Sequence, residues 1–208
     1  MCIPSAHIGV GFGPFTMPAG NVIKGILQAH EDYGIDTFVM TAPFGSAMVA
    51  RHWAKLAQTV TDAVTPHGCR ILYHNHDDEF HNLRGGGNAL DQFLKKTSPD
   101  VLLQIDIGWA GMAGDEYEIV KRYGDKLHTL HLKDFYGQYR GNYTRKNIPD
   151  EAFAPIGNGA IRTKACIDLV KTLPNFSGNY IIDQDKSTHG MLEDLKIGYY
   201  NLRRLTGI

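Results

Sequence analysis

Cysteine is scarce in this 208-residue chain. Its three cysteines, Cys2, Cys69 and Cys166, are far apart, odd in number and outside any C-x-x-C pattern. This spacing argues against both a disulfide framework and a cysteine metal site. Reduced thiols are the default inside the cell, so we expect a cytoplasmic protein.

The chain also lacks a long hydrophobic run and an excess of charge of one sign. No apolar stretch approaches the roughly 20 residues of a membrane span, and the first residues lack the basic-then-apolar pattern of a secretion signal. Lys and Arg total 21 against 22 Asp and Glu, for a net charge of −1. Nothing here attracts nucleic acid or an anionic membrane surface. We therefore predict small-molecule partners, with neither nucleic acid nor membrane among them.

What the sequence does have is an ordinary globular composition and an alternating pattern of elements. With 43% hydrophobic residues, the chain can bury one sizeable core, and we expect a single domain over residues 1–208. Predicted strands cover residues 2–8, 36–41, 101–106, 127–134 and 179–183, and a further strand lies in the stretch 70–80, where the apolar run Ile71–Tyr73 is followed by polar residues. Predicted helices cover residues 21–33, 46–67, 89–96, 115–123, 161–173 and 191–205.

Six strand-then-helix units predict an α/β fold, with a parallel sheet and helices outside it. A closed barrel of this type needs eight units and about 250 residues. The chain is two units short, so an incomplete or open barrel is expected. Its open strand edges predict dimerisation or poor solubility.

Four predicted strands each end in an ionisable side chain. The apolar run Ile71–Tyr73 leads to His74, and the next strands lead to Asp106, His131 and Asp183. Parallel strands bring their C-terminal ends to one rim, where α/β barrels keep their chemistry. Two imidazoles and two carboxylates are a donor set for Mn²⁺, Co²⁺ or Zn²⁺, while Mg²⁺ prefers oxygen.

Each of these residues has a structural alternative. His74 is either a ligand or a hydrogen-bonded structural histidine, and Asp106 is either a ligand or the cap of the next turn. Lys133 is either catalytic or paired with Asp134 or Asp106. Trp109 is either a substrate contact or a packing residue.

Two segments are also open to more than one interpretation. Gly157 and Gly159 resemble a fragment of a phosphate loop; we interpret them as a turn that could still present backbone N–H groups to an anion. The 26-residue segment Phe135–Ala160 predicts a functional lid or a disordered excursion.

Several motifs, taken together, resemble a known family. They are Ser5-Ala-His7, Tyr73-His-Asn-His76 with Glu79-Phe80, Asp106 with Trp109, His131-Leu-Lys-Asp134, Pro155-Ile-Gly-Asn-Gly159 and Ile182-Asp-Gln-Asp185. In this order they resemble the sugar phosphate isomerase/epimerase family with the xylose isomerase-like TIM barrel. The resemblance implies that the chain holds strands three to eight of such a barrel and lacks the first two.

The resemblance also implies roles for individual residues. His74, Asp106, His131 and Asp183 would bind a divalent metal ion, with Mn²⁺ expected first and Mg²⁺, Co²⁺ or Zn²⁺ as alternatives. Asp183 would act as the base, Glu79 or His76 as the opposing acid/base, and Lys133 as donor to a developing oxyanion. The remaining expected substrate contacts are His7, His76, Trp109, Asp134 and Asp185. The family usually has Glu at the positions of His74 and Asp183.

The implied activity is isomerisation or epimerisation of a sugar or keto-sugar. A proton next to the carbonyl is removed and a metal ion stabilises the enediolate. Dehydration of a keto-polyol would use the same site. A non-catalytic sugar-binding protein is the other alternative, favoured by the two departures from Glu. A DNA-repair endonuclease on the same barrel would need a basic surface, which the net charge disfavours.

Overall fold

The computed structural model describes residues 3–9 and 17–207. The chain divides into two compact units, residues 1–104 and 105–208. The predicted strand at residues 2–8 is shorter in the structure, and the part of that prediction that falls on residue 2 lies outside the described residues. The units are described in turn below.

The first unit contains a parallel sheet with strand order β1-β2-β3-β4. Its strands are β1 (Ala6–Ile8), β2 (Thr37–Thr41), β3 (Arg70–His74) and β4 (Leu102–Asp106), the last of which continues into the second unit. The register pairs Thr41 with His74 and His74 with Gln104. Polar residues at the C-terminal ends of neighbouring strands are therefore level with one another.

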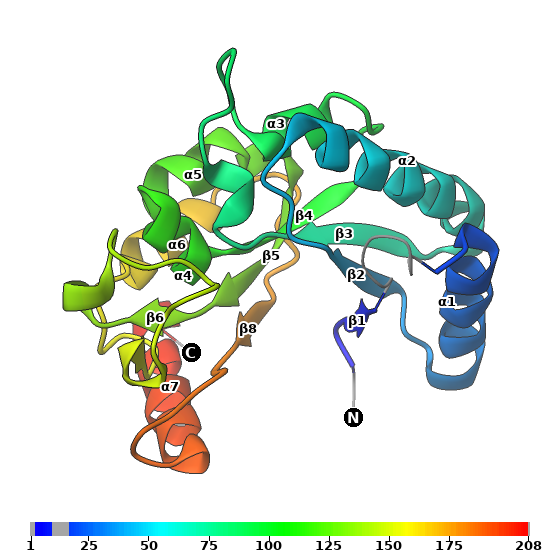
Figure 1. Cartoon of the computed structure of the whole chain (residues 1–208). Helices are drawn as coiled ribbons and strands as arrows, with labels where there is room; N and C mark the ends of the chain where they lie inside the picture. The colour runs from blue at the N-terminus through cyan, green and yellow to red at the C-terminus, as the bar shows by residue number, and fades with distance from the viewer. Residues whose placement is uncertain (1–2, 10–16, 208) are drawn as a thin grey trace. The chain divides into compact units, whose positions relative to one another are not determined.

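Helices α1 (Ala19–Tyr33) and α2 (Ala47–Val64) pack against each other on the same side of these strands (Figure 1). Ser46 caps α2 by accepting a hydrogen bond from the Val49 amide, as its position predicts. The cap predicted at Asn21 is wrong, because α1 begins two residues earlier, after Pro18, without a side-chain cap. Helix α3 (Ala89–Leu94) follows, with an Asn88 capping box.

The second unit pairs β5 (Leu127–Leu132) in parallel with β8 (Tyr180–Ile182), and His131 lies opposite Ile181. Its helices are α4 (Ile107–Ala113), α5 (Glu116–Arg122), α6 (Thr163–Val170) and α7 (Met191–Thr206). Helix α4 starts directly after the end of β4 and was not predicted. Among the described residues, no helix is both long and apolar enough to cross a membrane.

The segment from Phe135 to Ala160 is ordered and packed, so the prediction of a disordered excursion is wrong. Near its two ends lie the short strands β6 (Asp134–Phe135) and β7 (Phe153–Ala154), which pair with each other in antiparallel fashion. Phe135 and Phe153 pack with Trp109 in an aromatic core, which Tyr139, Tyr143 and Ile148 cover. Arg140, within this segment, forms an ion pair with the buried Glu116 of α5 and so holds the segment against that helix.

The described residues therefore contain six strands in parallel pairs, with helices between them, which confirms the predicted α/β class. Eight such strands would be needed to close a barrel. Among the residues that the structure describes, Cys69 is a buried thiol of the first unit and Cys166 is a buried thiol of the second.

Candidate functional site

Three histidines of the first unit lie in its strands or just after them: His7 within β1, His74 at the end of β3, and His76 two residues after β3. His74 ends β3 and is 4% exposed; its ring centroid is 5.3 Å from that of His7 and 5.2 Å from that of His76. His7 Nε2 also lies 2.9 Å from Oε1 of Gln104, a fully buried amide in β4. Gln104 was not predicted as a site residue. The sequence feature that could have identified it is a polar side chain inside an apolar strand. Gln104 lies two residues before Asp106, and therefore on the same face of the strand.

Glu79 is fully buried and holds together the ends of β2 and β3. Its Oε1 accepts a hydrogen bond from the Phe44 amide at 3.1 Å and lies 2.6 Å from the Tyr73 hydroxyl, while Oε2 accepts from the His76 amide at 2.8 Å. Burial raises the pKa of Glu79 to about 7, although these hydrogen bonds act in the opposite direction. The predicted acid/base role remains a prediction; the contacts assign Glu79 to positioning the His76 backbone.

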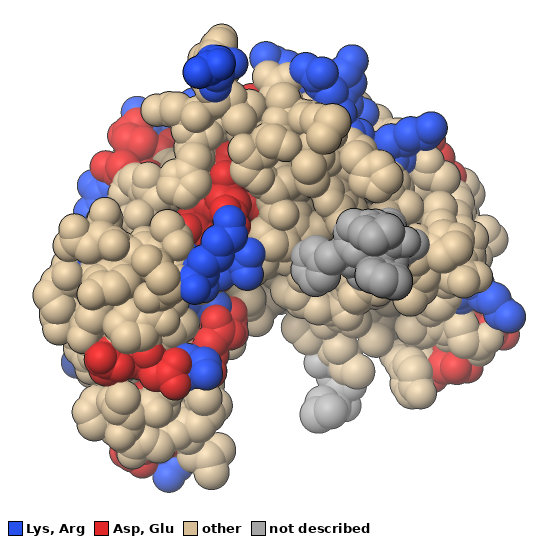
Figure 2. Space-filling view, viewed as in Figure 1, with Lys and Arg blue, Asp and Glu red and all other residues tan. Residues whose placement is uncertain are grey.

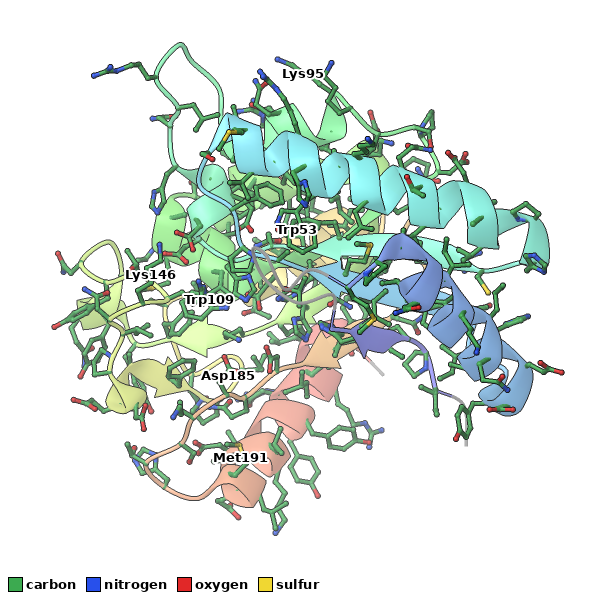
Figure 3. All side chains as sticks on the ribbon, turned by 45° about the vertical axis from the view of Figure 1, so that its right-hand side comes forward. Trp53, Lys95, Trp109, Lys146, Asp185 and Met191 are labelled. Carbon is green, nitrogen blue, oxygen red and sulfur yellow. The ribbon has the colours of Figure 1, made fainter. Side chains whose placement is uncertain are left out.

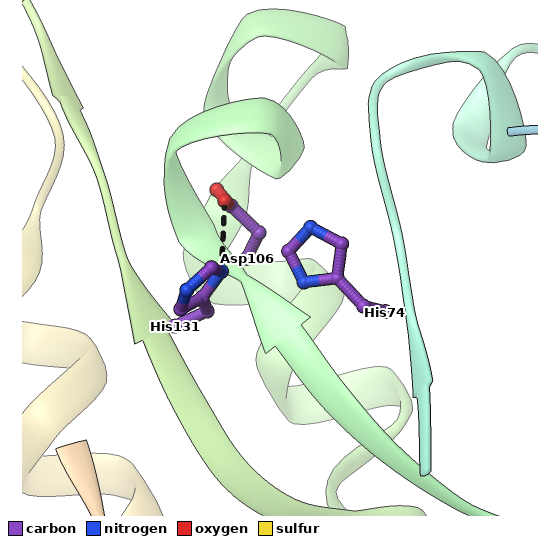
Figure 4. Close-up of side chains that lie close together, drawn as sticks. All are labelled: His74, Asp106 and His131. Carbon is purple, nitrogen blue, oxygen red and sulfur yellow. Dashed lines mark ion pairs between the residues drawn. The ribbon is translucent and has the colours of Figure 1, made fainter. Parts of the chain in front are cut away.

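Asp106 ends β4, and its two carboxylate oxygens have different tasks. Oδ1 accepts a hydrogen bond from the Trp109 amide at 2.9 Å and so caps α4, which confirms the capping alternative. Oδ2 lies 3.4 Å from His131 Nδ1, the ion pair drawn in Figure 4, and 3.8 Å from Lys133 Nζ. Burial works to raise the pKa of Asp106, but Lys133 and His131 outweigh it and the pKa is lowered. Asp106 is therefore a buried anion at neutral pH.

Lys133 is the buried cation of the second unit. Its Nζ lies 2.7 Å from Asp183 Oδ2, 2.6 Å from Asp185 Oδ2 and 5.1 Å from the centre of the Trp109 ring; Trp109 and Asp185 are labelled in Figure 3. Burial works to lower its pKa, but Asp106, Asp183 and Asp185 outweigh it and the pKa is raised. The predicted pairing of Lys133 with Asp106 is confirmed at 3.8 Å, whereas the alternative pairing with Asp134 is wrong.

Asp134 turns away from this group. Its Oδ2 accepts hydrogen bonds from the Gly157 and Gly159 amides, and its Oδ1 accepts from the Ile161 and Phe135 amides. Burial raises the pKa of Asp134 to about 6 against these four donors, so the group is ionised at neutral pH. Its predicted contact with substrate remains a prediction.

Donors of the kind that divalent metals prefer converge on His131. Both Asp106 Oδ2 and Asp183 Oδ2 lie within 4 Å of His131 Nδ1, at 3.4 and 3.7 Å. His131 and Asp106 are buried donors of the kind that a divalent ion binds, whereas Asp183 Oδ2 is also paired with Lys133 Nζ at 2.7 Å. The second unit thus brings together six predicted site residues: Asp106, Trp109, His131, Lys133, Asp183 and Asp185.

The sequence of this chain matches a known family over most of its length. The family described as Xylose isomerase-like TIM barrel matches residues 21–197. The chain therefore belongs to the xylose isomerase-like TIM barrel family, and its six strands form an incomplete barrel of that type. No curated protein matches the chain.

Solved structures show the same fold at low sequence identity. A sugar phosphate isomerase/epimerase from Parabacteroides distasonis ATCC 8503 has a TM-score of 0.77 and 18% identity, covering 97% of this chain and 72% of its own. The IOLI protein with a binding zinc atom has a TM-score of 0.71 and 15% identity, covering 98% and 75%. A xylose isomerase-like TIM barrel protein from Mycobacterium smegmatis in complex with magnesium has a TM-score of 0.68 and 13% identity, covering 91% and 67%.

Proposed function

We propose that this protein is a divalent-metal-dependent isomerase or epimerase of a sugar or keto-sugar. The observation that carries the proposal is the convergence of Asp106 and Asp183 on His131, beside the buried Lys133. Similarity in fold to a sugar phosphate isomerase/epimerase and to proteins with bound zinc or magnesium supports it. The chain covers about three quarters or less of these proteins.

The metal ligands in this proposal are His74, Asp106, His131 and Asp183. His74 is buried at the end of β3. In the strand register it lies opposite Gln104 of β4, which precedes Asp106 by two residues. When bound, a divalent ion supplies Lewis-acid polarisation of the substrate carbonyl. Mn²⁺ is the first choice because it accepts both imidazole and carboxylate ligands.

The chain's own residues supply the proton transfer. In an isomerisation, Asp183 takes the proton from the carbon beside the carbonyl and returns it to the neighbouring carbon. In an epimerisation, a second acid on the opposite face returns a proton to the same carbon, and the candidates for that role are Glu79 and His76. Lys133 donates a hydrogen bond to the oxygen that gains negative charge. Asp185 keeps the Lys133 ammonium in place, and its side chain is 45% exposed and able to accept a substrate hydroxyl.

Replacement of Asp106 by Asn tests this function. Asn can still cap α4 through its carbonyl oxygen but lacks the charge at Oδ2, so the fold should persist while metal content falls. We expect turnover of the sugar that the wild type converts best, chosen from a panel of aldoses and ketoses, to fall by at least about 100-fold. Elemental analysis of purified protein and product analysis by chromatography are the measurements.

Asp168→Asn is the matched control, because Asp168 is an exposed partner of Lys164 on α6. It should retain metal and activity. Unchanged turnover of the wild type after removal of bound metal by a chelator would contradict the proposal. Formation of a dehydrated product instead of an isomer would assign the same site to a dehydratase, and sugar binding without turnover in the metal-loaded protein would indicate a non-catalytic role.

A further inference from the structure

Gln104 is a fully buried amide whose side chain reaches a residue of a distant strand. Its neighbours in β4, Leu103 and Ile105, belong to the apolar core, but its Oε1 lies 2.9 Å from Nε2 of His7 in β1, 97 positions earlier. Two strands separate β1 from β4 in the sheet. In a flat sheet, β1 and β4 would be about 14 Å apart. The contact therefore requires a curved sheet, with both side chains on its concave face.

The strand register places this hydrogen bond beside a proposed metal ligand. His7 lies opposite Val39, and Thr41, two residues further along β2, lies opposite His74. His74 in turn lies opposite Gln104. Side chains that are opposite each other, or two positions apart in one strand, share a face of the sheet. The rings of His7 and His74 are in contact as well, with centroids 5.3 Å apart and planes at 64°.

The hydrogen bond determines which ring nitrogen of His7 carries a proton. The Oε1 atom of Gln104 can only accept, so Nε2 of His7 is the donor and carries the hydrogen. In the neutral ring, Nδ1 then has the lone pair and is an acceptor. His131, by contrast, has two carboxylates near its Nδ1, at 3.4 and 3.7 Å. The two histidines are therefore prepared for different tasks, because only His131 has charged partners of this kind.

His7 is able to meet a ligand, whereas Gln104 is not. His7 is exposed, although its partner is fully buried. Among the described residues, His7 belongs to no group of three or more donors that could hold one metal ion. The Lys and Arg side chains at the top of the first unit lie over α2 and α3, on its helical side (Figure 2). What His7 offers a ligand at the concave face is thus a hydrogen bond.

We infer that Gln104 is a positioning residue, which holds the His7 ring beside His74 so that Nδ1 accepts a hydrogen bond from a substrate hydroxyl group. This inference rests on the proposed function, in which the substrate binds next to His74. A hydroxyl group is a suitable donor to an unprotonated ring nitrogen. Without the amide, the exposed ring is free to turn, and the hydroxyl contact loses its fixed partner.

Nuclear magnetic resonance tests the hydrogen bond without any substrate. The ten histidines are labelled with ¹⁵N, and the spectrum of His7→Leu identifies the His7 signals. We expect the wild type to show a His7 Nε2–H proton that exchanges slowly with water, and Gln104→Met, which has a similar length but no amide, to lose it. Gln28→Met is the control, because Gln28 is exposed on α1 and bonds to Asp32. A proton on Nδ1 instead of Nε2 in the wild type, or a slowly exchanging Nε2–H that persists in Gln104→Met, would overturn the inference.

Kinetics of the Mn²⁺-loaded protein test whether the substrate uses this contact. With the sugar that the wild type converts best, Gln104→Met and His7→Leu should each raise KM by about 3- to 10-fold, the effect of one neutral hydrogen bond, and leave kcat nearly unchanged. The double variant should be no worse than His7→Leu alone, because Gln104 acts through His7. Gln28→Met should keep the wild-type KM.

The outcomes separate this inference from the proposed function. An unchanged KM in His7→Leu, or losses that add in the double variant, would overturn the role of Gln104 but leave the isomerase or epimerase standing. Absence of turnover in the metal-loaded wild type would overturn both. If Gln104→Met does not fold, the Nε2–H signal of the wild type and the KM of His7→Leu decide.

Discussion

Glu79 is a carboxyl group whose surroundings favour the protonated form. The Tyr73 hydroxyl has one proton but lies near two acceptors, the Ala42 carbonyl oxygen at 2.9 Å and Glu79 Oε1 at 2.6 Å. Burial raises the pKa of Glu79 to about 7, while the hydrogen bond from Tyr73 works to lower it.

Stability should therefore depend on pH through Glu79. Its pKa is higher in the folded chain than the ordinary 4.5, so its stabilising contribution is full below about pH 4.5 and is lost as pH rises through about 7. The difference amounts to roughly 3 kcal/mol. Glu79→Gln cannot ionise, and we expect urea denaturation to show a smaller fall in its free energy of unfolding between pH 5 and 7.5.

Glu193→Gln is the control for this measurement, because Glu193 is exposed on α7 and pairs only loosely with Lys196 at 3.8 Å. It should keep the pH dependence of the wild type. An unchanged pH dependence in Glu79→Gln would show that Glu79 is ionised in the folded chain throughout this range.

The sequence predicts which residues lie at the end of a strand, but it does not predict which distant residues they contact. The end of β5 was predicted to carry His131, Lys133 and Asp134. His131 does lie in β5, but Lys133 directly follows the strand and Asp134 begins β6. Lys133 contacts a residue 52 positions later, and Asp134 contacts amides 23 to 27 positions later. Strand periodicity gives the position of a side chain along a strand. It carries no information on which distant loop folds over that side chain.

Helix α4 shows the same limit for a secondary-structure element. Its sequence, Ile107-Gly-Trp-Ala-Gly-Met-Ala113, contains two glycines, which lower helix propensity and conceal the helix. The structure supplies the reason for one of them: a Cβ on Gly108 would lie 2.6 Å from Lys133 Cβ and 2.8 Å from the Lys133 carbonyl oxygen. Long amphipathic helices such as α2 were predictable because their burial follows a regular period.

Two helical glycines should consequently respond to alanine in opposite directions. Gly108→Ala forces α4 away from β5 and should destabilise the protein by about 1–3 kcal/mol, with loss of activity through Lys133. Gly25→Ala in α1 has open space around its Cβ and should stabilise by about 0.5–1 kcal/mol. Chemical denaturation of both variants measures the difference, and a stabilised Gly108→Ala would refute the close packing.

The unpaired edges of the sheet affect whether the protein associates with another copy of itself in solution. Among the described residues, β8 pairs with β5 alone and β1 pairs with β2 alone, so each has one edge without a strand partner. On α7, which follows β8, Leu192 is 75% exposed and Tyr200 is 67% exposed. Unpaired edges beside exposed apolar side chains favour association with another copy.

We therefore expect a homodimer, with about twice the 23.1 kDa mass of the chain in size-exclusion chromatography with light scattering. Leu192→Lys should shift the equilibrium to monomer. Met48→Lys replaces an equally exposed residue of α2, at 78% exposure, and should leave the mass unchanged. A monomeric mass for the wild type at every concentration tested would contradict dimerisation.

Cys69 and Cys166 are buried thiols in different units, so the reactivity of each thiol reports on the unit that surrounds it. Alkylating reagents attack the thiolate, and burial raises the pKa of Cys69 and that of Cys166, the latter to about 12. Neither sulfur should react until the unit around it opens. The rate of alkylation at each position, followed by mass spectrometry, thus times the opening of residues 1–104 and of residues 105–208 separately in one sample.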